Sequence, residues 1–178
     1  RPNVLHNKTP LHRITAERLR RAAGAWAPRL GSLPGPYIAV MIGGNSGPFS
    51  FDRAAGERLA RQASALANAR GGSLLVSTSA RTQPPAVDAF MEAVSAPAHV
   101  YRWRKGDPEN PYFAFLGLAE EIIVTGDSMS MLAEACATHK RVHIFDLGEG
   151  RYAMRESVAA AARREKSGEP WWKSFEKA

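Results

Sequence analysis

The hydrophobic positions of the chain fall into two kinds of segment that alternate from residue 37 to residue 146. Short runs such as YIAVMI (37–42) are apolar at nearly every position, which is typical of strands that are covered on both faces. Apolar residues three or four positions apart predict helices between these runs. The expected strands are 37–42, 73–79, 99–103, 121–126 and 141–146, and the expected helices are 16–30, 53–70, 84–94, 111–119, 128–138 and 152–166.

This alternation predicts an α/β fold with a parallel, Rossmann-like sheet of five or six strands and helices on both faces. We expect residues 1–36 to form a linker and a helix from a preceding domain, residues 37–150 the sheet domain, and residues 151–178 a C-terminal helix and tail. Ligands of such sheets bind beyond the carboxyl ends of the strands. The loops to search are therefore 43–51, 78–83, 103–111, 125–130 and 146–151.

The net charge of +7 is concentrated in the two flanks of the chain. Residues 1–30 hold seven basic residues and one acidic residue, whereas residues 31–150 hold ten basic and twelve acidic residues. A nucleic-acid-binding domain would gather its basic residues on a folded face, so we expect no nucleic-acid partner. A basic flank fits an anionic membrane or a neighbouring domain.

A single cysteine, Cys136, indicates a reducing, cytoplasmic compartment. It lies with Met129, Leu132 and Ala133 on the apolar face of the expected helix 128–138. The sequence therefore predicts that Cys136 is a buried core residue and not a nucleophile.

The loop GGNSGPFSF follows the first strand, and its three glycines, Gly43, Gly44 and Gly47, match neither a dinucleotide fingerprint nor an NTPase phosphate loop. Its backbone amides, together with Asn45 and Ser46, can approach a phosphate. The alternative is a flexible turn without a ligand.

The loop STSART follows the second strand and carries Ser79 and Arg81. The forked guanidinium of an arginine among hydroxyls suits an anionic oxygen. The alternative is a surface arginine on a capping turn.

The segment Arg102-Trp103-Arg104-Lys105, at the end of the third strand, has two interpretations. It can frame a nucleotide base, or it can pack on an edge strand.

The turn VTGDSMSMLAEACA follows the fourth strand and brings Asp127, Ser128 and Ser130 to the start of a helix. If Ser128 is the N-cap, the capping-box position is Met131, which leaves Glu134 unexplained as a box partner. The amide end of a helix with two serines is suited to phosphate, and a carboxylate one turn further along can accept hydrogen bonds from a ribose diol. The alternative for Glu134 is a solvated side chain on an amphipathic helix.

The segment NPYFAFLGLAEEIIVTGDSMSMLAEACATHKRVHIFD resembles the C-terminal donor domain of GT-B glycosyltransferases. More narrowly, PNVL with HRIT, VMIGGNSG, LLVSTSART and VTGDSMSMLAEA resemble the family named for the plant mitochondrial-fission (elongated-mitochondria) protein. Its bacterial members are described as glycosyltransferases, and some are labelled nucleoside-diphosphate-sugar epimerases. The similarity covers about residues 1–150.

The resemblance implies that residues 37–150 bind a nucleotide sugar as the donor substrate, with no other cofactor and no metal, since no aspartate pair stands at ligand spacing. It implies an acceptor domain that precedes residue 1. The residues assigned to the nucleotide and its diphosphate are Gly43, Gly44, Asn45, Ser46, Gly47, Ser79, Arg81, Asp127, Ser128 and Ser130, with Glu134 assigned to the ribose.

Three further expectations accompany this assignment. NAD-dependent epimerisation is rejected, because the glycine pattern is wrong and Tyr152 is followed four residues later by Glu156 and not by lysine. An isolated donor half would expose the face that meets its partner domain, which favours self-association. The alternative function is a non-catalytic interaction protein that uses its basic flanks at a membrane, peripherally at the inner membrane of the cell.

Overall fold

The computed structural model describes residues 3, 6–7, 9–46 and 49–147. Gly47 and the expected helix 152–166 lie outside the described residues. Along the chain the elements are α1 (Ala16–Trp26), the 3-10 helix η1 (Ala27–Leu30), β1 (Tyr37–Met41), α2 (Arg53–Arg70), β2 (Ser73–Ser77), α3 (Pro84–Ala93), β3 (Ala98–Tyr101), α4 (Tyr112–Leu118), β4 (Glu121–Thr125), α5 (Met129–Cys136) and β5 (Arg141–Phe145).

The five strands form one sheet in the order β3-β2-β1-β4-β5, and every neighbouring pair is parallel. This confirms the predicted α/β, Rossmann-like fold, with five strands among the described residues. The chain builds outward from β1 to β3 and then crosses back to place β4 on the other side of β1. The order therefore reverses between β1 and β4, the position at which open α/β sheets usually hold their ligands.

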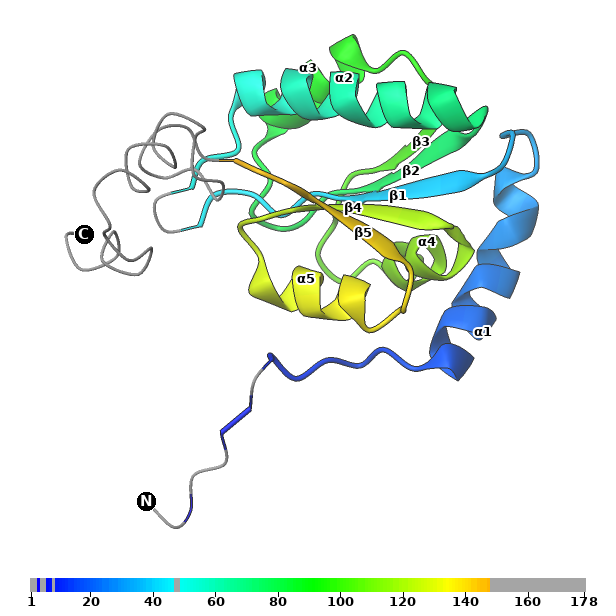
Figure 1. Cartoon of the computed structure of the whole chain (residues 1–178), viewed down its shortest axis with the longest axis vertical. Helices are drawn as coiled ribbons and strands as arrows, with labels where there is room; N and C mark the ends of the chain where they lie inside the picture. The colour runs from blue at the N-terminus through cyan, green and yellow to red at the C-terminus, as the bar shows by residue number, and fades with distance from the viewer. Residues whose placement is uncertain (1–2, 4–5, 8, 47–48, 148–178) are drawn as a thin grey trace, which may run out of the picture.

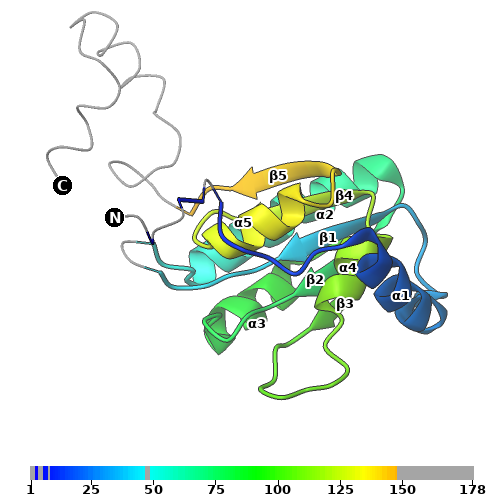
Figure 2. The ribbon, with the colours of Figure 1, turned by 90° about the horizontal axis from the view of Figure 1, so that it is seen from below.

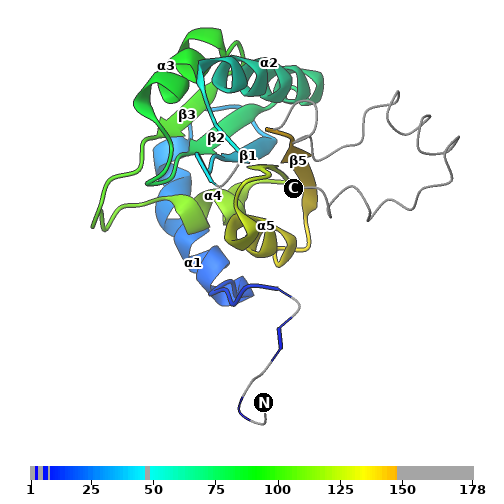
Figure 3. The ribbon, with the colours of Figure 1, turned by 90° about the vertical axis from the view of Figure 1, so that its left-hand side faces the viewer.

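The helices form a layer on each face of the sheet (Figure 1, Figure 3). Helices α2 and α3 cover one face, where Phe51, Leu59 and Phe90 are at most 1% exposed. Helices α1, α4 and α5 lie on the other face, where Phe115 and Leu116 are fully buried. Both faces of β1 and β2 are buried, which explains why their sequences are continuously apolar.

Local signals in the sequence account for the helix ends. The side chains of Thr15, Asp52 and Ser128 each accept a hydrogen bond from the backbone N–H three residues on, and so satisfy one of the free donors at the start of α1, α2 and α5. Gly71 ends α2 with φ of 67°, a conformation that a residue without a Cβ adopts at little cost.

The structure corrects two sequence expectations. Cys136 is exposed and Met129 is 65% exposed, so the prediction that both belong to the buried face of α5 is wrong. The helix buries Leu132 and Ala135 instead. Strand β3 ends at Tyr101, two residues earlier than expected, because residues 102–111 leave the sheet and project beyond its β3 edge (Figure 2).

Candidate functional site

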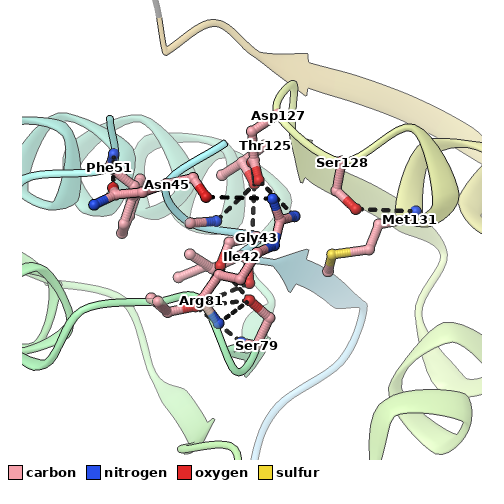
Figure 4. Close-up of polar contacts among 12 residues, drawn as sticks. Ile42, Gly43, Asn45, Phe51, Ser79, Arg81, Thr125, Asp127, Ser128 and Met131 are labelled. Carbon is pink, nitrogen blue, oxygen red and sulfur yellow. Dashed lines mark hydrogen bonds and ion pairs between the residues drawn. The ribbon is translucent and has the colours of Figure 1, made fainter. Parts of the chain in front are cut away.

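The loops that follow β1, β2 and β4 meet at the point where the strand order reverses, and their side chains form one polar network (Figure 4). The network contains Gly43, Gly44 and Asn45 after β1, Ser79, Arg81 and Thr82 after β2, and Thr125 and Asp127 at the end of β4. The sequence predicts most of these residues as neighbours, because carboxyl ends of parallel strands share one edge of the sheet.

Asp127 is the centre of this network. Its side chain is 0% exposed, so only the main chain of this residue reaches the surface. Oδ2 accepts hydrogen bonds from the Gly44 N–H and from Arg81 Nη2, both at 3.0 Å, and Oδ1 accepts from the Thr125 hydroxyl at 2.7 Å. One carboxylate thus joins three loops that are far apart in the sequence.

Thr125, like Thr82 after β2, is a network residue to which the sequence analysis assigned no role. Its hydroxyl accepts from the Gly43 N–H at 2.8 Å and donates to Asp127. Thr125 is fully buried as the last residue of an apolar strand. A hydroxyl at the end of a buried strand, two residues before a carboxylate, was the available signal.

The two adjacent glycines are required by the close approach of the loops. A Cβ at Gly43 would overlap the carboxylate of Asp127, and a Cβ at Gly44 would overlap the main-chain carbonyl of Arg81. Gly44 also has φ of 153°, which disfavours residues with side chains. Loop packing therefore explains why the glycine spacing matches no nucleotide fingerprint.

Ser79 and Thr82 hold the β2 loop against the β1 loop. Both hydroxyls donate to the carbonyl oxygen of Gly43, and the Ser79 hydroxyl also accepts from the Arg81 N–H at 3.2 Å. Thr82 in turn accepts from the Ser79 N–H at 2.9 Å. The Ser79 hydroxyl, expected to meet a ligand, is thus engaged within the protein.

Arg81 lies at the outer side of the network, with its side chain 41% exposed. Besides its bond to Asp127, its Nη1 donates to the carbonyl oxygen of Asn45 at 3.4 Å. The Asn45 side chain accepts from the Phe51 N–H at 2.9 Å, and Ser46 forms a backbone bridge with Phe49. The loop that flanks Arg81 is therefore held by its own internal bonds.

The start of α5 lies beside this network (Figure 4). The Ser128 hydroxyl accepts from the Met131 N–H at 3.4 Å, as expected for an N-cap, and Ser130 is exposed. Further along the helix, Glu134 Oε2 accepts a hydrogen bond of 2.7 Å from the hydroxyl of Tyr112. Burial and this carboxylate raise the pKa of Tyr112, so the hydroxyl remains a donor.

Other polar groups that the sequence analysis weighed lie elsewhere. Trp103 is 38% exposed, and the backbone N–H of this residue donates to the buried Thr78 hydroxyl at 2.8 Å. Arg102 pairs with Asp88 at 2.7 Å on the β3 side. A shallow hollow of about 380 Å³ lies there, and another of about 520 Å³ includes Arg70 and Glu121. Neither hollow is lined by the network residues.

Two kinds of feature are absent from the part of the chain that the structure describes. No three His, Cys, Asp or Glu side chains gather in a group that could hold a metal ion. No helix there is long and apolar enough to cross a membrane.

The strand order and the strand-end network define a Rossmann-like α/β protein. The chain belongs to the mitochondrial fission ELM1 family, which it matches over residues 1–168, and this confirms the family that its motifs resemble. It is 30% identical over 148 residues to the mitochondrial fission protein ELM1 of Arabidopsis thaliana, covering 82% of this chain and 34% of the plant protein. It is 34% identical over 114 residues to the uncharacterized protein RP120 of Rickettsia prowazekii (strain Madrid E), covering 61% and 31% of the two chains.

The chain thus spans about a third of the length of these curated relatives. Among solved structures, a universal stress protein from Archaeoglobus fulgidus is similar with a TM-score of 0.40 and 20% sequence identity, over 62% of this chain and 93% of that protein.

Proposed function

We propose that the strand-end network binds the diphosphate of a nucleotide sugar and that the chain supplies the donor-binding half of a GT-B-like glycosyltransferase. The observation that carries this proposal is the placement of Arg81. Its guanidinium is held in a fixed orientation, remains 41% exposed, and stands at the reversal point of a parallel sheet. An arginine fork at this position suits the paired oxygens of a phosphate.

The start of α5 supports the same ligand class. The first backbone N–H groups of a helix have no carbonyl partner within it and point out of its N-terminal end, where the helix dipole favours negative charge. Ser128 and Ser130 add hydroxyls there, and Ser130 is exposed. In our proposal these groups and Arg81 contact the diphosphate from two sides.

Glu134 is assigned to the ribose of the same nucleotide. The carboxylate is only partly buried, and Tyr112 holds one of its oxygens at 2.7 Å. This bond fixes the side-chain orientation and leaves Oε1 to accept from a diol, since a carboxylate has several acceptor sites. Tyr112 is therefore a supporting residue that the sequence analysis did not identify.

In glycosyl transfer, the bond between the anomeric carbon and the diphosphate oxygen breaks, and the electron pair leaves with the diphosphate. Fixed donors aimed at that oxygen stabilise the developing charge. Arg81 and the α5 amides have this role in our proposal. The acceptor hydroxyl forms the new bond to the anomeric carbon and gives its proton to a general base. The preceding domain that the family resemblance implies would supply that base and bind the acceptor.

Calorimetric titration with UDP and GDP and their sugar derivatives tests the proposal, and CMP and its derivatives, which carry one phosphate, show whether the diphosphate is required. We expect one nucleotide series to bind, with an affinity that falls about tenfold or more in Arg81→Gln because a charge-assisted hydrogen bond is lost. Arg102→Gln is the matched control, since Arg102 is paired with Asp88 on the β3 side. Absence of binding to this chain, both alone and together with the preceding domain that the family resemblance implies, would refute the proposal.

A non-catalytic interaction function is the alternative, favoured by the exposed arginines of the first helix and by the name of the plant relative. Flotation with vesicles that contain anionic lipids separates the two functions. The alternative predicts vesicle binding that is lost when Arg13, Arg20 and Arg21, all exposed, are changed to glutamine, and that is unaffected by Arg81→Gln. Our proposal predicts that nucleotide binding is weakened by Arg81→Gln and is unaffected when Arg13, Arg20 and Arg21 are changed to glutamine.

A further inference from the structure

Asp127 is an unusual residue to find in a site for a diphosphate. Two negative groups in contact repel each other, and this repulsion is strong where water is excluded. The sequence nevertheless places Asp127 in the turn between β4 and α5, and the structure buries its carboxylate completely. A ligand at the surface therefore cannot contact this carboxylate without a rearrangement of the loops.

The bonds of Asp127 lead to Arg81, whose guanidinium can contact an anion, and to the buried Gly43–Gly44 turn beside it. Through Oδ2 it holds the Arg81 guanidinium and the Gly44 N–H, each at 3.0 Å. Through Oδ1 and the Thr125 hydroxyl it also fixes the Gly43 N–H, which donates to Thr125 at 2.8 Å. One carboxylate thus sets the position of a cationic side chain and of two consecutive backbone amides.

The hydrogen bonds of the Arg81 guanidinium fix the orientation of its plane. A guanidinium has five N–H donors in one plane, and Arg81 uses one on Asp127 and one on the Asn45 carbonyl. These two bonds fix the plane, and the remaining donors lie on a side chain that is 41% exposed. Freezing a long side chain before the ligand arrives lowers the entropy lost on binding.

We propose that Asp127 is a positioning residue: its buried carboxylate anchors the Arg81 guanidinium to the Gly43–Gly44 turn in the orientation that receives a nucleoside diphosphate, and it contacts no phosphate itself. This inference rests on the proposed function for its ligand. It changes the role that the sequence suggests for Asp127 from a ligand contact to a support for other contacts. Its claim about Arg81 holds in the unliganded protein, where it can be tested separately.

The first experiment uses the protein without ligand. NMR of ¹⁵N-labelled arginine side chains reports whether the Arg81 guanidinium rotates freely. We expect restricted rotation in the wild type and averaged Arg81 signals in Asp127→Asn, with the remaining arginine signals unchanged. The matched control is Asp88→Asn, which removes the exposed carboxylate that pairs with Arg102. Identical Arg81 signals in the wild type and Asp127→Asn would overturn the inference.

The second experiment is a double-mutant cycle read by titration with UDP or GDP, whichever binds the wild type. We expect Asp127→Asn and Arg81→Gln each to weaken binding about tenfold, and the double variant to bind no more weakly than Arg81→Gln alone. If Asp127 instead met the phosphates, removing its charge would tighten binding. Tighter binding, or losses that simply add, would overturn the inference.

Outcomes for the function and for Asp127 are distinguishable. If no nucleotide binds the wild type but Arg81 loses its restricted rotation in Asp127→Asn, the proposed function fails and the positioning of Arg81 stands. If Asp127→Asn does not fold by circular dichroism, Arg81→Lys replaces it, because lysine keeps the charge and lacks the fork. Wild-type nucleotide affinity in Arg81→Lys would show that charge alone suffices and would overturn the inference.

Discussion

Gly43 stands where three loops meet, and its lack of a side chain is a requirement of that packing. A Cβ at this position would overlap the Asp127 carboxylate, whose position is already fixed by Thr125 and Gly44. We therefore expect Gly43→Ala to lower the free energy of unfolding by roughly 1–3 kcal/mol, a usual cost of overpacking. Urea unfolding followed by circular dichroism measures it.

Gly24 provides the matched control for this substitution. It lies in α1, and a Cβ there would meet no atom within 4 Å apart from its chain neighbours and the backbone of its own helix. Gly24→Ala should therefore raise the free energy of unfolding by roughly 0.5–1 kcal/mol, the difference in helix propensity between the two residues. Equal stability of the two alanine variants would contradict the account of the Gly43 turn.

The same residues show what a sequence can reveal about a site and what it cannot. Asp127, Arg81 and the glycines could be selected as candidates, because each follows an apolar strand and such strand ends share one edge. Whether the Asp127 carboxylate faces solvent depends on Gly43, Gly44 and Arg81, which come from other strand ends and meet it only after the sheet has formed. Burial of a polar side chain by residues from distant segments leaves no periodic pattern.

At the scale of single elements, the pattern of apolar residues was a good guide to where strands and helices lie and a poorer guide to their exposed faces. The expected range of α2, 53–70, agrees with the structure, because Asp52 caps its start and Gly71 ends it. In α5 the predicted apolar face was wrong for Met129 and Cys136. A helix of 8 residues offers too few turns to fix its buried face from sequence alone.

Glu121 joins three elements, and its protonation should affect the stability of the domain. It accepts from His143 on β5 at 2.7 Å and from Arg70 on α2 at 2.9 Å, and these partners lower its pKa below the ordinary value. Because the pKa is depressed in the folded state, this stabilisation is present above the ordinary value of 4.5 and is lost as pH falls through the folded pKa.

The test is the urea midpoint of the wild type and of Glu121→Gln between about pH 3 and pH 7, the interval in which carboxylates titrate. The wild type should be the more stable near pH 7, and the difference should shrink as the solution is acidified. Glu92→Gln, which removes a carboxylate that is 66% exposed, is the control. A difference that does not depend on pH would contradict the role of Glu121.

Lys140 ties the start of β5 to the end of α4. Its Nζ donates to the main-chain carbonyls of Leu116 at 2.7 Å and Gly117 at 2.8 Å and also to that of Ala119, which would otherwise lack partners at a helix end. Lys140→Met should therefore lower the free energy of unfolding by roughly 1–3 kcal/mol, the cost of unsatisfied buried acceptors.

Unfolding in urea measures this loss, and Lys105→Met on the exposed loop after β3 is the control. A surface change of that kind should alter the stability by no more than about 0.5 kcal/mol. If the two methionine variants lost equal stability, the hydrogen bonds of Lys140 to the carbonyls at the end of α4 would not be what stabilises the protein at this position.

At the scale of the whole molecule, helix α1 is an integral part of the layer that α4 and α5 form on one face of the sheet. Helix α1 packs along α4, where Arg18 lies over the Phe113 ring at 3.9 Å and Trp26 meets Phe115 edge to face with ring centroids 5.7 Å apart. Leu19 and Leu30 are 9% and 1% exposed in the same core. The sequence pattern assigns residues 1–36 to a linker and a helix from a preceding domain. These contacts raise the question of whether the sheet domain is stable without α1.

Two fragments decide the boundary, one that begins at residue 12 and retains α1, and one that begins at residue 36. Burial of two leucines alone is worth roughly 3–6 kcal/mol, which approaches the whole stability of an ordinary domain, roughly 5–15 kcal/mol. We therefore expect the shorter fragment to lose its cooperative thermal transition and its near-ultraviolet circular dichroism, while the longer one keeps both. Equal unfolding midpoints for the two fragments would show that the sheet domain is complete without α1, as the sequence pattern predicts. A lost transition would place the start of the folded unit before residue 16, because the covering of the sheet depends on that helix.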